Sequence, residues 1–150
     1  RMSEIHAAIG VEQMKKLPSF LTKRRQNFNH LEEGLKKIDS VTVLPQPVDE
    51  RFYSSHYCLG MMLDQGVVHK RPALMEALGK KGVGTSIYYP QPVPRMTYYK
   101  LKYGYEEKKF LNAATISDGI IALPVGPHLQ LSDMDYIIKT TEEVWSEMNV

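Results

Sequence analysis

Hydrophobic residues three or four positions apart mark the first quarter of the chain as helical. Apolar side chains follow Ser3 at this spacing, and the series resumes after Pro18 and runs on to Ile38. Arg24 is the one charged member of the later series. Ser3 suits a helix N-cap, because its hydroxyl accepts a hydrogen bond from a free backbone N–H. Pro18 either kinks the helix or opens the first turn of a second one. The pattern predicts a long helix over residues 3–38, kinked or divided at the proline.

Shorter apolar runs beyond this helix predict a small sheet with helices beside it. Strands are expected over 41–45, 55–63, 83–89 and 120–125, and further helices over 71–82, 106–119 and from 132 onward. In the second run, alternation places Tyr57 on one face with Leu59, Met61 and Leu63. Strands interleaved with helices are typical of a two-layer α/β (α+β) fold, and we expect one domain over residues 1–150.

The last predicted helix has a clear start signal. Ser132 with Asp135 three residues later is a variant of the capping box, and Asp133 adds negative charge to the first turn. We therefore expect Ser132 to be the N-cap of this helix.

Composition narrows the class of protein. The 150 residues are 43% hydrophobic and 24% charged, as in an ordinary globular domain. A net charge of +2 is too small to indicate a nucleic-acid partner, and no apolar stretch approaches the roughly 18 residues of a membrane span. One cysteine, Cys58, excludes an internal disulfide framework and favours a reducing compartment, so we expect a cytoplasmic protein. The basic run Lys23-Arg24-Arg25 is interpreted as a solvated helix face.

Most familiar catalytic patterns are missing from the sequence. The five histidines have no metal-ligand spacing with the cysteine, so no metal site is predicted. Neither a nucleotide-binding glycine motif nor a serine-hydrolase elbow occurs.

Two features could bind a ligand. Arg1 precedes the helix start capped by Ser3, which is either an anion site or an ordinary helix terminus. In the third strand, alternation places Tyr88 on the face of Ser86 and Tyr89 on the other. At most one of these tyrosines packs in the core, and the other either packs on the surface or offers its hydroxyl to a ligand.

Three stretches resemble, in order and register, the DegT-type sugar aminotransferases: RMSEIHAAIGVEQMKKL, GVGTSIYYPQPVP and IIALPVGPHLQLSDMDYII. Members of that family use pyridoxal 5'-phosphate (PLP), have the aspartate-aminotransferase fold (fold type I) and aminate keto-sugars carried on nucleotides. The resemblance extends from Arg1 to the final helix. It implies the small C-terminal domain of such an enzyme: a short, mostly antiparallel sheet packed against helices and entered by the long helix 3–38. The large PLP-binding domain would lie upstream.

The resemblance also implies site residues. Arg1, supported by Ser3, would lie near the PLP phosphate of the partner subunit in a homodimer. Ser86, Tyr88 and Tyr89 would bind substrate, with Tyr88 at a position where many relatives have histidine. The lysine that carries the cofactor as a Schiff base would lie upstream of Arg1. We therefore expect this chain to have no catalytic residue and no activity by itself.

The function implied for the whole protein is transfer of an amino group, with glutamate the expected donor, to a nucleotide-linked keto-sugar. Such a step would belong to lipopolysaccharide or other polysaccharide biosynthesis, or to deoxysugar biosynthesis. The alternative is a free-standing α/β module for binding or dimerisation, without chemistry. A lysine-bearing PLP domain upstream would distinguish the enzyme from the module.

Overall fold

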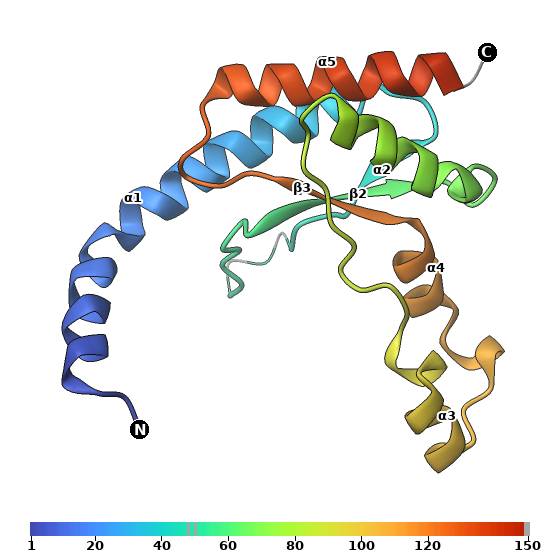
Figure 1. Cartoon of the computed structure of the whole chain (residues 1–150), viewed down its shortest axis with the longest axis horizontal. Helices are drawn as coiled ribbons and strands as arrows, with labels where there is room; N and C mark the ends of the chain where they lie inside the picture. The colour runs from blue at the N-terminus through green and yellow to red at the C-terminus, as the bar shows by residue number, and fades with distance from the viewer. Residues whose placement is uncertain (48, 50, 149–150) are drawn as a thin grey trace.

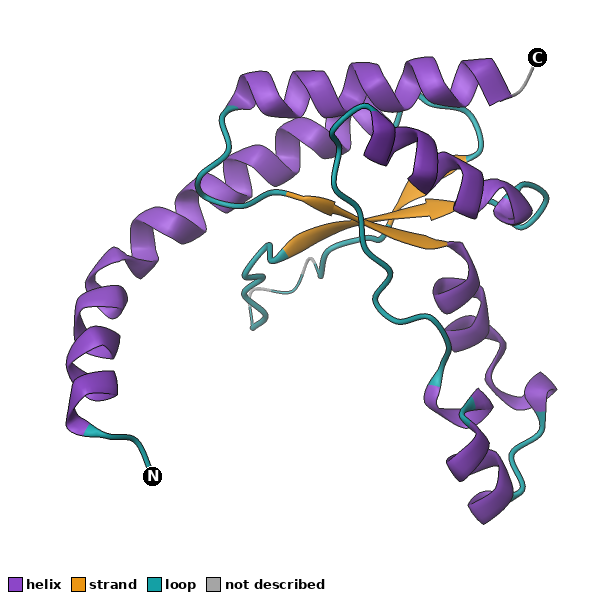
Figure 2. Cartoon of the chain, in the orientation of Figure 1, coloured by secondary structure: helices purple, strands orange, loops and turns teal. Residues whose placement is uncertain are grey.

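The computed structural model describes residues 1–47, 49 and 51–148. Its helices and strands lie in two layers (Figures 1 and 2). The α-helices and strands are α1 (Glu4–Leu35), β1 (Val41–Val43), β2 (Cys58–Leu63), α2 (Arg71–Lys80), α3 (Thr97–Tyr103), α4 (Leu111–Gly119), β3 (Ile120–Pro124) and α5 (Leu131–Met148). Short 3-10 turns occur at η1 (Val68–Lys70), η2 (Val93–Arg95) and η3 (Glu107–Phe110). The predicted mixed fold with a short antiparallel sheet is confirmed.

The sheet has the order β1-β2-β3, and both pairings are antiparallel. Its buried face is lined by side chains such as Leu59 and Met61, against which α5, α2 and the second half of α1 pack (Figure 1). Leu63 shares this burial, whereas Tyr57 precedes β2 and is 63% exposed. Of the four residues predicted to share one face, the three within β2 are therefore buried in the core, while Tyr57 lies exposed just before the strand.

The third predicted strand, over 83–89, is not a strand. Only Ser86 pairs with β3: its N–H donates to the Ala122 carbonyl at 3.2 Å, and the Ala122 N–H donates back at 2.7 Å. Backbone N–H groups two residues apart point to the same edge of a strand. To lengthen the pairing beyond Ala122, β3 would therefore have to use the N–H groups of Ile120 and Pro124. Pro124 has no N–H, and the Ile120 N–H bonds to the Ile116 carbonyl at the end of α4. The pairing consequently stops at one bridge.

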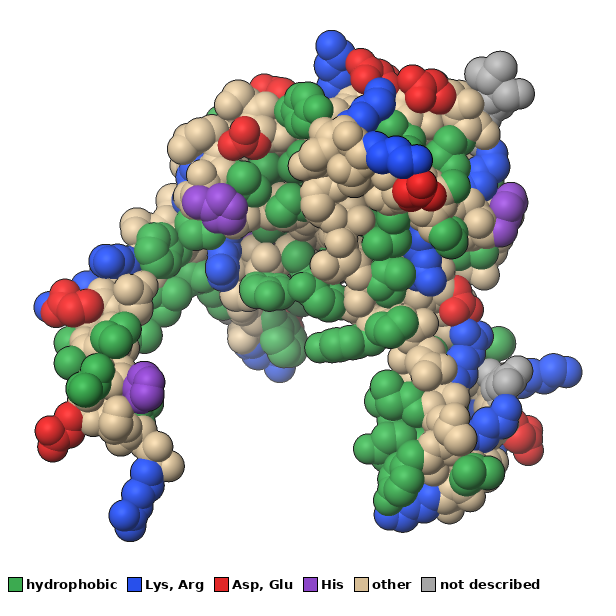
Figure 3. Space-filling model, in the orientation of Figure 1, with side chains coloured by type: hydrophobic (Ala, Val, Ile, Leu, Met, Phe, Trp, Pro, Cys, Tyr) green, Lys and Arg blue, Asp and Glu red, His purple; other side chains and the backbone are tan. Residues whose placement is uncertain are grey.

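The first helix is continuous through Pro18 and bends as it leaves the sheet (Figure 1). It ends at Leu35, three residues before the predicted end. Its buried side chains begin only at Asn27. The preceding half projects away and exposes apolar side chains, including Ile5 and Met14 (Figure 3).

A lobe of η2, α3, η3 and α4 projects from the opposite side of the sheet (Figures 1 and 2). Its base is tied to the main body by Arg71, whose Nη1 donates to the Ser117 carbonyl at 2.6 Å. Within the lobe, Arg95 of η2 pairs with Asp118 of α4 at 2.7 Å. Hydrophobic side chains gather on this lobe (Figure 3), and Leu101 is 82% exposed. In the described part of the chain, no helix has the length and hydropathy to cross a membrane.

The last helix begins one residue earlier than predicted, and Ser132 is not its N-cap. The carboxylate of Asp133 accepts from the Gln130 N–H at 2.7 Å, while the Gln130 carbonyl accepts from the N–H groups of Asp133 and Met134. Asp135 instead lies 2.6 Å from His30 on α1. The side-chain bond back to the residue before the helix therefore forms as in a capping box, but it comes from Asp133 and not from Asp135. The reason is that the loop before α5 sets where the helix starts.

Candidate functional site

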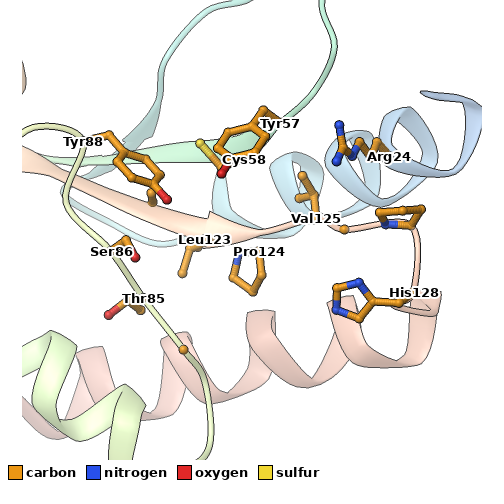
Figure 4. Close-up of a pocket in the computed structure, with 14 residues that line it drawn as sticks. Arg24, Tyr57, Cys58, Thr85, Ser86, Tyr88, Leu123, Pro124, Val125 and His128 are labelled. Atoms are coloured by element: carbon orange, nitrogen blue, oxygen red, sulfur yellow. The ribbon is translucent and has the colours of Figure 1, made fainter. Parts of the chain in front are cut away.

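A cavity of about 290 Å³ opens between α1, the segment 84–88 and the loop after β3 (Figure 4). It is lined by Arg24, Tyr57, Cys58, Gly84, Thr85, Ser86, Tyr88, Ala122, Leu123, Pro124, Val125, Gly126, Pro127 and His128. The lining therefore combines an apolar floor, formed by the end of β3, with hydroxyl, guanidinium and imidazole groups at its rim. Such a mixture is typical of small-molecule sites.

One wall of the cavity depends on the single bridge between Ser86 and Ala122. That pair of backbone hydrogen bonds holds the segment beside β3, and the chain then turns away so that Tyr88 overhangs the cavity. The hydroxyls of Tyr88 and Tyr57 point toward one another (Figure 4), and their ring centroids are 6.2 Å apart. A hydrogen bond to Tyr88 raises the pKa of Tyr57, because donating its proton stabilises the neutral phenol. Tyr57 therefore remains a neutral donor at physiological pH.

Arg24 lies at the opposite side of the cavity, on α1. Its guanidinium carbon is 5.8 Å from the centroid of the Tyr57 ring. Its Nε is buried and has no hydrogen-bond partner. The interpretation of the run Lys23-Arg24-Arg25 as wholly solvated is thus wrong for Arg24. The signal that could have found it was its place in an otherwise apolar helical series.

The loop after β3 forms the third wall and is tied to α1 by Asn27. The Asn27 side-chain amide donates to the carbonyls of Gly126, at 3.0 Å, and Leu129, at 3.2 Å. Against this loop, the His128 ring folds back over Gly126, where an added Cβ would lie 2.6 Å from the imidazole Cε1. A side chain at position 126 would therefore displace His128 from the rim.

The structure separates the predicted site residues into two groups. Ser86 and Tyr88 both line the cavity. Tyr89 is 71% exposed and lines a neighbouring apolar hollow that it shares with Tyr88. Neither tyrosine is buried in the core.

Arg1 and Ser3 lie at the free end of the projecting half of α1, away from the cavity (Figure 1). Ser3 caps α1 by accepting from the His6 N–H at 3.4 Å, and its hydroxyl also lies 2.8 Å from the His6 Nδ1. The predicted N-cap is thus confirmed. Within this chain, Arg1 and Ser3 do not meet Ser86 or Tyr88.

The chemical content of the cavity suits binding more than bond breaking. Burial raises the pKa of the Cys58 thiol, which favours the unreactive protonated form. Of the described residues that line the cavity, none is a lysine or a carboxylate. Across residues 1–47, 49 and 51–148, no cluster of three His, Cys, Asp or Glu side chains could hold a metal ion.

Comparison with known proteins assigns the chain to a family. The model of the DegT/DnrJ/EryC1/StrS aminotransferase family matches residues 1–142. The chain belongs to this family. The resemblance inferred from the three sequence stretches is therefore confirmed.

Individual relatives are distant but similar along nearly the whole chain. The spore coat polysaccharide biosynthesis protein SpsC of Bacillus subtilis is 24% identical over 144 residues, which cover 95% of this chain and 36% of SpsC. The structure of Helicobacter pylori PseC, an aminotransferase in the biosynthesis of pseudoaminic acid, matches with a TM-score of 0.86 and 23% identity. That match covers 98% of this chain and 38% of PseC.

DesI, whose structure was determined in the presence of its TDP-sugar product, matches with a TM-score of 0.81 and 20% identity. The match covers 98% of this chain and 36% of DesI. At these identities, the solved structures establish the fold. The chain spans little more than a third of the length of these relatives.

Proposed function

We propose that this chain is the small C-terminal domain of a PLP-dependent aminotransferase that transfers an amino group from an amino acid, glutamate being the expected donor, to a nucleotide-linked keto-sugar. The family match over residues 1–142 carries the proposal. The TDP-sugar product of DesI supports a nucleotide-linked substrate, and the name of SpsC supports a role in polysaccharide biosynthesis.

The cavity supports the substrate part of this proposal. Ser86 and Tyr88 lie in one hollow, and their hydroxyls can both donate and accept hydrogen bonds, as sugar hydroxyls require. Tyr89 extends the same aromatic surface, since the centroids of the Tyr88 and Tyr89 rings are 5.9 Å apart. We propose that these three residues orient the sugar. With tyrosine in place of the histidine found in many relatives, position 88 would offer a hydroxyl instead of an imidazole.

The described residues fit PLP only in part. The pyridine ring and the aldehyde need a carboxylate and a lysine, and the cavity lining described above contains neither. The phosphate finds better partners at the start of α1, where the guanidinium of Arg1 accompanies a helix N-terminus capped by Ser3. We propose that Arg1 and Ser3 hold the phosphate of a cofactor bound otherwise by residues outside this chain, across the subunit interface of a homodimer. When bound, PLP would supply the carbonyl group that accepts and returns the amino group.

The test is reduction of the PLP-treated full-length gene product with borohydride, followed by intact mass measurement and peptide mapping. The expected result is one pyridoxyl adduct on a lysine outside residues 1–150. The matched control is the 150-residue chain treated identically, which should gain no adduct and show no aminotransferase activity. A full-length product without an adduct would favour the non-catalytic module. Transamination by the isolated chain would overturn the assignment of the catalytic lysine to another part of the protein.

A further inference from the structure

We infer that Arg24 is the oxyanion anchor of the cavity, binding a carboxylate or phosphate group of the substrate. The inference rests on the proposed function only in taking the ligand to be a substrate of the whole enzyme. The cavity, the unpaired guanidinium and the neighbouring hydroxyls are properties of this chain.

The first support is the unmet hydrogen-bonding capacity of Arg24. Its Nε is buried without an acceptor, and none of the ion pairs or hydrogen bonds among the described residues involves its guanidinium. Buried donors in folded proteins nearly always have a partner, because leaving one unpaired costs about 1–3 kcal/mol. No carboxylate lines the cavity within the described part of the chain to supply it. The outer guanidinium N–H groups, which are not buried, are the ones that a ligand oxyanion in the cavity would meet.

The second support is the geometry around the guanidinium. Arg24 reaches from α1 toward the ring of Tyr57, and the hydroxyls of Tyr57 and Tyr88 lie across the same cavity (Figure 4). Contact with an aromatic ring restrains the guanidinium while leaving its edge N–H groups free to form paired hydrogen bonds. The raised pKa of Tyr57 keeps its hydroxyl protonated beside the cation. An oxyanion here would therefore meet one fixed positive charge with tyrosine hydroxyls nearby.

The adjacent arginine shows that these features are specific to position 24. Arg25 also lies against an aromatic ring, with its guanidinium carbon 5.0 Å from the centroid of Tyr53. It is exposed, however, and does not line the cavity. The two side chains thus share charge, helix and type of aromatic contact, but only Arg24 faces the hollow.

The source of the oxyanion is a carboxylate of the amino donor or a phosphate of the nucleotide. A single cation and a cavity of about 290 Å³ suit a small, singly charged group better than a whole diphosphate. Carboxylate is therefore the expected ligand group, and the experiment separates it from phosphate.

The test uses the full-length gene product without added PLP and measures binding by titration calorimetry. The two probes are glutarate, for a carboxylate, and inorganic pyrophosphate, for a phosphate. Arg24→Gln should weaken binding of the recognised probe by about 10- to 150-fold, the range for losing hydrogen bonds to a charged group. Arg24→Lys keeps the charge but cannot form the paired hydrogen bonds, so its affinity for the probe should lie between those of wild type and Arg24→Gln. Arg25→Gln should bind within about twofold of wild type.

Each result decides the inference. A loss confined to glutarate assigns a carboxylate, and a loss confined to pyrophosphate assigns a phosphate. The inference fails if wild type binds neither probe, if Arg24→Gln binds both normally, or if Arg25→Gln loses as much. If Arg24→Gln does not fold, wild-type affinity in Arg24→Lys is the overturning result. The binding measurement needs no PLP, so it is independent of the adduct experiment. If the lysine adduct forms but the probes do not bind through Arg24, only this inference fails. Oxyanion binding without an adduct defeats only the proposed function.

Discussion

The amide of Asn27 joins the first helix to a loop about one hundred residues later, and Asn27→Ala tests what that link contributes. The side chain is fully buried, and its two N–H donors are both used, by the carbonyls of Gly126 and Leu129. Truncation would remove both bonds. The Gly126 carbonyl would still accept from the Leu129 N–H at 3.1 Å, whereas the Leu129 carbonyl would lose the Asn27 donor. It would also remove the Asn27 Oδ1, which is buried without a partner, so part of the loss is offset.

The magnitude follows from these contacts. Two hydrogen bonds at about 1 kcal/mol each, plus the Leu129 carbonyl left without this donor and less the relieved Asn27 oxygen, give a loss of roughly 2 kcal/mol in unfolding free energy. For a chain of this size, that corresponds to a fall of about 4–8 °C in Tm. Asn27→Asp has the same shape but places acceptors against carbonyls, so it should lose at least as much.

Urea unfolding of the 150-residue chain measures the effect, with Asn29→Ala as the matched control. Asn29 is the same residue type on the same helix but is exposed. Its replacement should change stability by at most about 0.5 kcal/mol, in the stabilising direction, because alanine favours helix more than asparagine does. If Asn27→Ala stayed within about 0.5 kcal/mol of wild type, the two bonds would not be holding the loop, and the assignment of Asn27 as its anchor would be refuted.

Two further predictions concern packing and pH. Gly34→Ala should cost about 1–2 kcal/mol, because an added Cβ would lie 2.3 Å from the Ile138 Cδ1. The double variant with Ile138→Ala should show a favourable coupling in a double-mutant cycle, and simple additivity would contradict a clash. Stability should also fall as pH drops through about 6.5, since burial and then the charge of Arg25 lower the pKa of His56 below its ordinary 6.5. The unfolded chain binds that proton more readily, so unfolding gains favour below the ordinary pKa. His56→Asn, which suits the positive φ of 45° at this position, should flatten that part of the pH profile of urea unfolding. An unchanged slope would contradict the role of His56.

Much of the secondary structure could be predicted because its causes lie within a few residues. The apolar spacing from Phe28 to Leu35 produces the buried face of α1, and Pro72 with Gly82 brackets α2. The segment 83–89 had an equally plausible strand pattern, yet it forms one bridge. Whether it pairs further depends on the N–H groups of β3, which lies some 35 residues later in the chain. There, Pro124 has no N–H, and the N–H of Ile120 is already bonded to the end of α4.

The candidate site shows the same division. Ser86 and Tyr88 could be singled out from their segment and from the family resemblance, and both line the cavity. Arg24 and His128 could not be connected with them, since no local pattern tells which side chains from distant segments will share a hollow. The position of Arg24 in an apolar series was the only trace in the sequence.

By itself, the sequence determined where most helices and strands form and which family the chain belongs to, because periodicity, caps and ordered motifs depend on neighbouring residues. Only the tertiary structure decided that Arg24 leaves the solvated face and lines the cavity, and that Asn27 fastens the opposite wall. The bonds from Asn27 join positions 99 and 102 residues apart. Such contacts form only when the whole chain has packed, so their geometry is a property of the fold and not of any single segment.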